Sequence, residues 1–165
     1  MPLFLGIFAK KRGRTMSKST HFRPVVPGSH RDTFLLPAEA GAEVRLNPIE
    51  RTLFHIFLTH PEGIAADRLI LHWQELRDIY LHESCFDDPS QQEDALEALC
   101  AESRTTFYTN ISRIKRKLTA LLGARRAAAY IIRRGKDGRY RTHATFIPRA
   151  YTSNTASGTK SRFSP

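Results

Sequence analysis

The chain has 165 residues, a length that supports one domain with a core large enough to need no disulfides. Its formal net charge of +10 is unevenly distributed: residues 1–31 hold seven basic and no acidic side chains, residues 32–102 four and fifteen, and residues 103–165 fifteen and one. Such polarity predicts one binding face for a polyanion and disfavours a uniformly basic surface. The only two cysteines, Cys85 and Cys100, exclude a disulfide framework and favour a reducing compartment.

The first part of the chain predicts an arm followed by a small hairpin. Residues 1–31 are basic and irregular, so we expect a flexible arm there. Residues 33–36 and 43–46 flank a short connection and predict the two strands of a β-hairpin. We expect the folded domain to span residues 32–147, and residues 148–165, rich in Ser, Thr, Ala and Gly, to form a disordered tail.

The extreme N-terminus argues against export and against a membrane anchor. Its apolar residues 1–8 are too short to span a bilayer, and the basic run follows them, which is the wrong order for a secretory signal. Met16 is an alternative start. We therefore expect a cytoplasmic protein with no membrane partner.

Residues 47–50, Asn-Pro-Ile-Glu, mark the start of a first helix. Asn47 can cap it, Pro48 suits the first helical position, and Glu50 can complete a capping box. The helix should end near His60. Its inward side chains are expected to be Leu53, Phe54, Ile56 and Phe57.

A second helix is predicted from about Ala65 to His82, and another in the acidic segment of about residues 84–103. The buried stripe of the second helix would be Leu69, Trp73, Leu76 and Tyr80. Residues 85–90 predict a loop, and Ser90 begins a capping-box pattern that opens the acidic segment. The acidic middle of the chain, residues 32–102, provides either a contact surface for a protein partner or a solvated face that keeps the protein soluble. The insert at residues 84–103 is either a partner surface or a fourth helix. Both interpretations stay open.

Residues 105–141 carry the clearest functional signal. A helix that stops at Gly123 is predicted by the apolar spacing of Phe107, Ile111, Ile114, Leu118 and Leu121. The opposite face and its flanks are polar or basic: Thr105, Thr106, Thr109, Asn110, Ser112, Arg113, Arg116 and Lys117. Residues 130–134 and 139–141 then predict two strands around a Gly-rich turn, giving a hairpin that bears Arg134, Lys136 and Arg139. A polar, basic helix followed by a basic hairpin predicts contact with phosphates and base edges of nucleic acid.

Several stretches resemble the OmpR/PhoB-type winged-helix output domains. Residues 46–50 and 60–64 resemble the start of that family's first helix and the Pro-Gly turn after it, and residues 110–118 resemble its recognition helix. Residues 135–140 resemble its wing turn and terminal tyrosine. The resemblance covers about residues 32–145. It implies an α+β winged helix-turn-helix fold with three to four helices, a small N-terminal β-hairpin and a C-terminal hairpin wing.

The resemblance also implies contacts residue by residue. It places Thr106, Asn110, Arg113 and Arg116 in the major groove, and Arg134, Lys136 and Arg139 at the minor groove or phosphates. The helical wheel adds Thr109, Ser112 and Lys117. The guanidinium groups of Arg113 and Arg116 suit guanine, and the amide of Asn110 suits adenine. The chain departs from the family in having no receiver domain, in its insert at residues 84–103, and in lacking the usual Arg and Asp at the start of the recognition helix.

These observations predict sequence-specific binding of double-stranded DNA by a bacterial transcription regulator. One alternative is a protein-interaction module that contacts RNA polymerase or another protein through residues 83–102; another is nonspecific nucleic-acid binding. Whether the protein forms a homodimer stays open. We expect no cofactor and no enzyme activity, because the chain has neither a P-loop nor a Gly-x-Ser-x-Gly elbow. We also expect no metal, because no Cys-x-x-Cys or His-x-x-x-His pair occurs and His82, Cys85 and Cys100 lack a fourth ligand.

Overall fold

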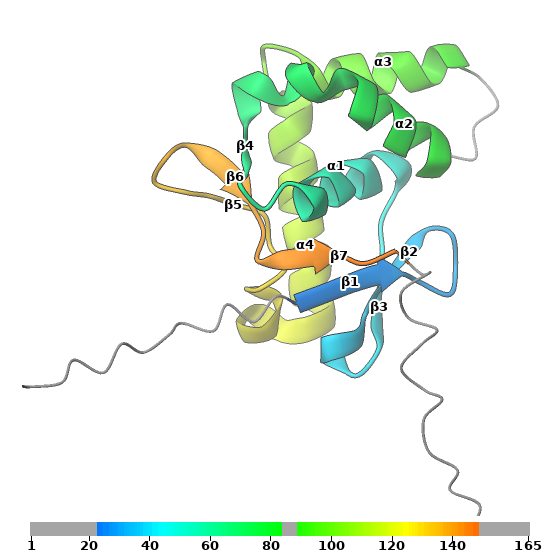
Figure 1. Ribbon diagram of the computed structural model, residues 1–165, viewed down its shortest axis with the longest axis vertical. Coiled ribbons are helices and arrows are strands. Elements are labelled where there is room, and N and C mark those ends of the chain that lie inside the picture. Colours follow the sequence, from blue (N-terminus) through cyan, green and yellow to red (C-terminus); the bar gives the residue numbers. More distant parts are fainter. Residues whose placement is uncertain (1–22, 84–88, 149–165) are drawn as a thin grey trace, which may run out of the picture.

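The computed structural model describes residues 23–83 and 89–148, which form a mixed α+β structure (Figure 1). This confirms the α+β part of the predicted fold class. In chain order the elements are β1 (Arg23–Pro27), β2 (Thr33–Leu36), the 3₁₀ turn η1 (Pro37–Glu39), β3 (Ala42–Arg45), α1 (Pro48–Thr59), β4 (Ile64–Ala65), the 3₁₀ helix η2 (Ala66–His72), α2 (Trp73–Glu83), α3 (Pro89–Cys100), α4 (Thr105–Ala127), β5 (Arg133–Arg134), β6 (Arg139–Arg141) and β7 (Ala144–Phe146). Helix α1 lies between a four-stranded sheet and α2, and it packs across α4 (Figure 1).

The four-stranded sheet has the order β3-β2-β1-β7. The predicted hairpin is present as β2 and β3, which pair antiparallel from Thr33 opposite Arg45 to Leu36 opposite Ala42. β1 pairs antiparallel with β2 and parallel with β7. The sheet thus joins the two ends of the described chain.

The prediction of a flexible arm over residues 1–31 is wrong for residues 23–27, which form β1. Val25 is fully buried there, because β1 lies between β2 and β7 in the sheet. Arg23 is also bound to the domain: its Nη1 lies 2.7 Å from Oε1 of the buried Glu39. Residues 1–22 and 149–165, which include the rest of the predicted arm and nearly all of the predicted tail, lie outside the described residues.

Helix α1 begins and ends where the sequence predicts. Asn47 Oδ1 accepts the Glu50 N–H at 2.8 Å, and Glu50 Oε2 accepts the Asn47 N–H at 3.0 Å, so the capping box is complete. The four predicted inward side chains are all fully buried: Leu53, Phe54, Ile56 and Phe57. The sequence therefore predicted both the cap and the buried face of this helix correctly.

The second predicted helix is two helices joined end to end. Residues 66–72 form the 3₁₀ helix η2, and α2 begins only at Trp73. Leu69, Leu76 and Tyr80 are buried as predicted, but Trp73 is half-buried. Helix α3 starts at Pro89, so Ser90 lies inside the helix and the predicted cap at Ser90 is wrong. Most of the predicted loop at 85–90 lies outside the described residues.

Helix α4 is the long helix in the centre of the fold (Figure 1). Phe107, Ile114 and Leu118 are buried as predicted. Leu122 is buried in place of the predicted Leu121, which is exposed. The predicted stop at Gly123 is a break in the helix: this residue has φ 75° and ψ 157°, a region open essentially to glycine alone.

The second sheet has the order β4-β6-β5 and contains the predicted basic hairpin. Its first strand is shorter than predicted, because residues 130–132 bury their side chains in the core before β5 begins. β4, the short strand after α1, pairs antiparallel with β6, with Ile64 opposite Tyr140. Over residues 23–83 and 89–148, no helix has the length and apolar character needed to span a membrane.

Candidate nucleic-acid interface

One face of α4 presents hydrogen-bonding and basic side chains to solvent. Five of the residues predicted for this face are exposed: Thr105, Thr109, Ser112, Arg113 and Arg116. They follow one another at helical spacing, so they form a stripe opposite Phe107, Ile114 and Leu118. α4 contains no acidic residue. Nothing along the helix itself therefore neutralises the two guanidinium groups.

Two residues predicted for this face are used inside the domain. Asn110 is 3% exposed, and its Nδ2 donates to the carbonyl oxygen of Thr106 at 2.8 Å. Its Oδ1 is buried and has no hydrogen-bond partner among the described residues. In this conformation the amide of Asn110 is not exposed to a ligand, so the predicted adenine contact would require its side chain to move. Thr106 is half-buried beside it.

Lys117 is the second of these residues, and its ammonium group pairs with a buried carboxylate of α1. Its Nζ lies 2.5 Å from Oε2 of Glu50, whose side chain is 1% exposed, while the Lys117 side chain is 37% exposed. The buried carboxylate of the α1 capping box requires a cation, and Lys117 supplies it. This ion pair is a structural role for the Lys117 charge that competes with the predicted DNA contact.

The hairpin of β5 and β6 exposes the three predicted cations Arg134, Lys136 and Arg139. The Gly135 N–H donates to the Arg139 carbonyl at 2.7 Å and closes the turn. Asp137, the only acid after residue 103, forms an ion pair with Arg141. Its carboxylate is therefore matched, and the hairpin tip keeps an excess of positive charge.

An aromatic cluster joins this hairpin to the start of α4. The rings of Phe107 and Tyr140 lie edge to face with centroids 5.1 Å apart, and Tyr108 packs on both rings. Burial and then the hydrogen bond with Tyr108 raise the pKa of the Tyr140 hydroxyl. The charges of Arg134 and Arg104 act on this hydroxyl in the opposite direction, so both cations lie near the junction. The aromatic cluster thus places the basic hairpin against the start of the basic helix.

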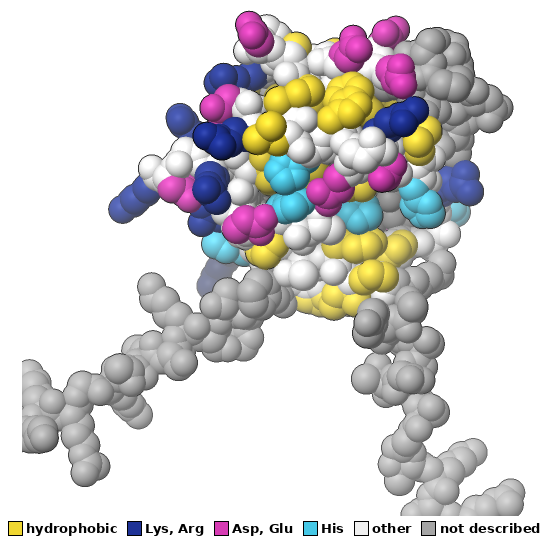
Figure 2. Space-filling view, turned by 45° about the horizontal axis from the view of Figure 1, so that its top comes forward, with side chains coloured by type: hydrophobic (Ala, Val, Ile, Leu, Met, Phe, Trp, Pro, Cys, Tyr) yellow, Lys and Arg dark blue, Asp and Glu magenta, His cyan; other side chains and the backbone are white. Residues whose placement is uncertain are grey.

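Sequence reasoning missed three residues of this surface. Tyr108 is exposed on α4, Arg133 is exposed on β5, and Arg104 is half-buried at the N-cap of α4 with φ 53°. Arg133 could have been found, since it directly precedes Arg134 in the same basic run. Lys and Arg side chains gather at the left of Figure 2, the side on which Figure 1 places β5 and β6.

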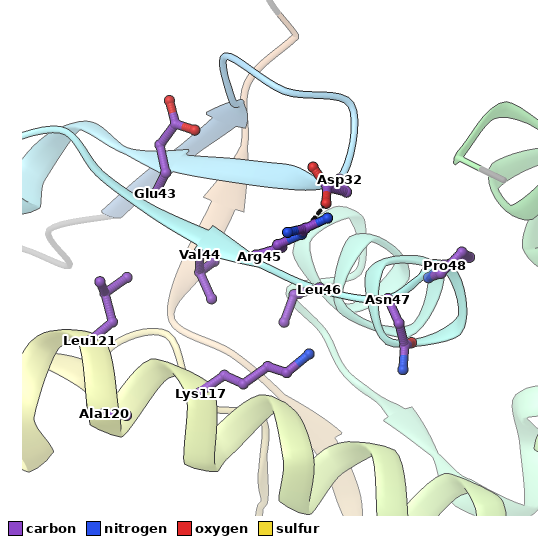
Figure 3. Close-up of a pocket in the computed structure, with 10 residues that line it drawn as sticks. All are labelled: Asp32, Glu43, Val44, Arg45, Leu46, Asn47, Pro48, Lys117, Ala120 and Leu121. Carbon is purple, nitrogen blue, oxygen red and sulfur yellow. Dashed lines mark hydrogen bonds and ion pairs between the residues drawn. The ribbon is translucent and has the colours of Figure 1, made fainter. Parts of the chain in front are cut away.

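A groove of about 790 Å³ lies on another side of α4, between that helix and β3 (Figure 3). Val44, Leu46 and Leu121 give it apolar walls, and Lys117 and the Asp32–Arg45 ion pair line it as well. β3 is the edge strand of the four-stranded sheet, so α4 runs past the sheet here. This explains why Leu121 stays exposed while Leu122 is buried.

The acidic helix α3 exposes Glu93, Asp94 and Glu97, and none of them belongs to the basic surface.

Comparison of the chain with known protein families, with curated proteins and with solved structures gave no match.

Proposed function

We propose that this chain is a winged helix-turn-helix protein that binds double-stranded DNA and regulates transcription. α4 takes the part of the recognition helix in the major groove, and the β5–β6 hairpin is the wing that reaches the adjacent phosphates or minor groove. α1, η2–α2 and α4 form the helical part, and the pairing of β4 with β6 attaches the wing to it. α3 is an insertion between the last two of these helices.

The observation that carries this proposal is the continuity of the two basic elements. Arg113 and Arg116 are exposed on α4, and Arg134 is held close to α4 through the Tyr140–Phe107 contact. A guanidinium fork can donate to O6 and N7 of guanine in the major groove, while cations on a hairpin tip contact phosphates. Binding should therefore combine base reading with steep salt dependence.

A selection experiment tests the proposal. The full chain is incubated with a random-sequence duplex pool at two salt concentrations, and the bound DNA is sequenced. We expect an enriched motif that an Arg113→Ala/Arg116→Ala variant no longer selects. The matched control is Arg45→Ala/Arg125→Ala, which removes the same charge from exposed positions on β3 and at the far end of α4. Equal loss of selection in both variants, or salt-sensitive binding without a motif, would refute sequence-specific reading by α4.

A second candidate is a protein contact through α3, with RNA polymerase as one such partner. The supporting observation is that Asp94 and Glu97 are exposed on α3, whereas Glu93 lies 3.5 Å from Arg77 of α2. An Asp94→Asn/Glu97→Gln variant should then lose a basic protein partner and keep its DNA motif. Loss of the DNA motif in this variant would count against α3 as a separate contact surface.

A further inference from the structure

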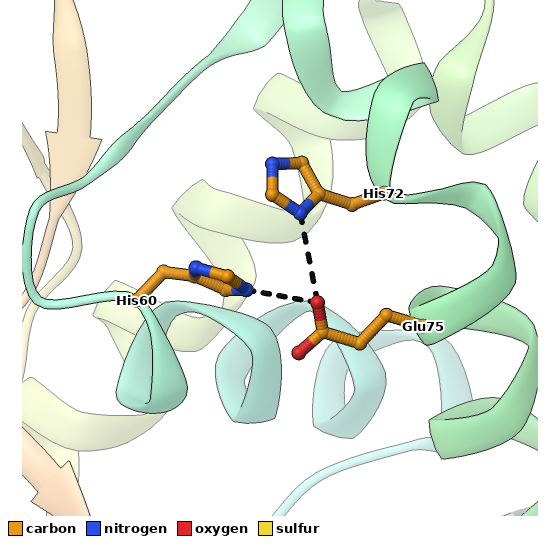
Figure 4. Close-up of side chains that lie close together, drawn as sticks. All are labelled: His60, His72 and Glu75. Atoms are coloured by element: carbon orange, nitrogen blue, oxygen red, sulfur yellow. Dashed lines mark hydrogen bonds and ion pairs between the residues drawn. The ribbon is translucent and has the colours of Figure 1, made fainter.

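Two histidines and a glutamate meet where α1 ends and α2 begins (Figure 4). His60 is the C-cap of α1, His72 is the last residue of η2, and Glu75 lies in the first turn of α2. His60 Nε2 is 2.8 Å and His72 Nδ1 is 3.5 Å from Glu75 Oε2. The three ligand atoms all lie within 4.8 Å of one another.

We propose that His60, His72 and Glu75 form a binding site for a divalent zinc-class cation, with water as the fourth ligand. Two imidazole nitrogens and one carboxylate oxygen are a ligand set that Zn²⁺ takes in proteins. Ligands about 2.0–2.1 Å from a tetrahedral Zn²⁺ lie about 3.4 Å from one another. The two nitrogen–oxygen separations bracket this value, and the two nitrogens lie within 4.8 Å of each other, so side-chain rotations can bring all three atoms onto one ion.

A further carboxylate supports this assignment. His60 Nδ1 lies 2.7 Å from Glu62 Oε1. Metal-binding histidines commonly donate their other ring N–H to a carboxylate, which fixes the tautomer and makes the ligating nitrogen more basic. With Nδ1–H donated to Glu62, Nε2 is the atom that faces Glu75 and His72. The arrangement therefore includes an orienting residue as well as three ligands.

The three side chains are accessible to an ion from solvent. The side chains of His60, His72 and Glu75 are 20%, 28% and 40% exposed. Histidine side chains gather in the middle of the face shown in Figure 2, beside acidic ones. Enough of the site is open for a water molecule to complete the coordination. Mg²⁺, which prefers oxygen ligands in an octahedral arrangement, does not suit it.

The position of the site predicts what the ion does. It links the end of α1 to the start of α2 across the turn that leads into β4. The Gly63 N–H donates to the His60 carbonyl at 3.0 Å within this turn. A bound ion therefore holds two helices and their connection together, and it should stabilise the fold in the absence of any DNA.

Calorimetric titration of the full chain with Zn²⁺ at pH 7.5, without DNA, tests the site. We expect binding of one ion and a higher Tm with Zn²⁺ but not with Mg²⁺. His72→Asn should abolish the high-affinity binding, and Glu62→Gln should weaken it about 10–100-fold. His30→Asn, at an exposed histidine in the turn between β1 and β2, is the matched control and should bind as the wild type does.

Each outcome decides the proposal. Equal Zn²⁺ affinity in the wild type and His72→Asn would mean that other histidines bind the ion, and it would overturn the assignment. Absence of Zn²⁺ binding by the folded wild type would leave His60 as a histidine paired with two carboxylates and would overturn it as well. Tetrahedral absorption bands of a Co²⁺ complex, lost in His72→Asn but kept in His30→Asn, would support it. None of these results depends on whether the chain binds DNA.

Discussion

A Lys117 variant tests whether this side chain stabilises the fold or contacts DNA. Lys117→Met removes the charge and keeps much of the aliphatic stem. The buried Glu50 side chain, which is 1% exposed, would then keep only the Asn47 N–H as a described partner of its carboxylate. Removing one partner of a buried ion pair costs about 3–5 kcal/mol. Because the Lys117 side chain is 37% exposed, water reaches one side of the pair. We therefore expect a loss of about 2–3 kcal/mol.

Urea unfolding of four proteins measures this loss: the wild type, Lys117→Met, Glu50→Gln and the double variant. Gln keeps an oxygen that can accept the Asn47 N–H but needs no cation. The double variant should therefore recover at least about 1 kcal/mol of the free energy of unfolding lost in Lys117→Met. Additive losses would show that the two side chains do not depend on each other.

Salt dependence of DNA binding provides the second half of the test. If Lys117 serves Glu50, the slope of log K against log salt should be the same in Lys117→Met as in the wild type. Loss of one phosphate contact would instead reduce that slope by about 0.9. A variant with unchanged stability and a reduced slope would refute the assignment and restore Lys117 to the DNA-contacting face.

Three further predictions concern single side chains. Arg113→Ala should cost about 1–3 kcal/mol of DNA-binding free energy and relax one base position of the selected motif; uniform loss on every sequence would make Arg113 a phosphate contact. Gly63→Ala should lower the free energy of unfolding by more than Gly41→Ala does in urea titrations. Both glycines have positive φ, 82° at Gly63 and 74° at Gly41. A Cβ at Gly63 would lie 2.7 Å from the Tyr140 carbonyl oxygen, whereas the atom nearest to a Cβ at Gly41 would be 3.9 Å away. Equal losses of unfolding free energy in the two variants would contradict this prediction. Burial lowers the pKa of His55 from its ordinary 6.5 to about 4. As the pH falls through this range, the unfolded chain takes up a proton at His55 before the folded chain does. The free energy of unfolding should therefore decrease by about 3 kcal/mol as the pH falls from 6.5 to about 4. The wild-type pH profile minus that of His55→Gln isolates this contribution, and a flat difference would refute it.

Local signals were enough to predict much of the helical part. The Asn47–Glu50 capping box involves neighbours three residues apart, and the apolar spacing in α1 and α4 identifies the buried faces without knowledge of the partner elements. The hairpin of β2 and β3 and the basic hairpin of β5 and β6 are also contacts between near neighbours. Each of these features depends on a short stretch of chain, and each was predicted.

Contacts between distant segments account for what the sequence could not predict. β1 is a strand between two partners, the nearby β2 and β7, which follows more than a hundred residues later. Its own sequence contains Pro24 and Pro27, which argue locally against a strand. The position of Leu121 likewise depends on where the sheet ends beside α4. Periodicity places a side chain on a helix face, but the neighbouring element decides how wide the buried part of that face is.

The basic surface and the proposed metal site also depend on contacts between distant segments. Charge along α4 does not reveal that Lys117 is matched to a carboxylate 67 residues earlier, while Arg113 and Arg116 have no acid on their helix. Conversely, His60 and His72 are twelve residues apart and follow no metal-binding spacing. They come together because the turn after α1 folds back to start η2, and Glu75 then lies one helical turn beyond His72. A polar side chain is available to an external ligand only if the core does not use it, and this ligand set forms only because the chain returns to itself. Both conditions are properties of the packing between elements.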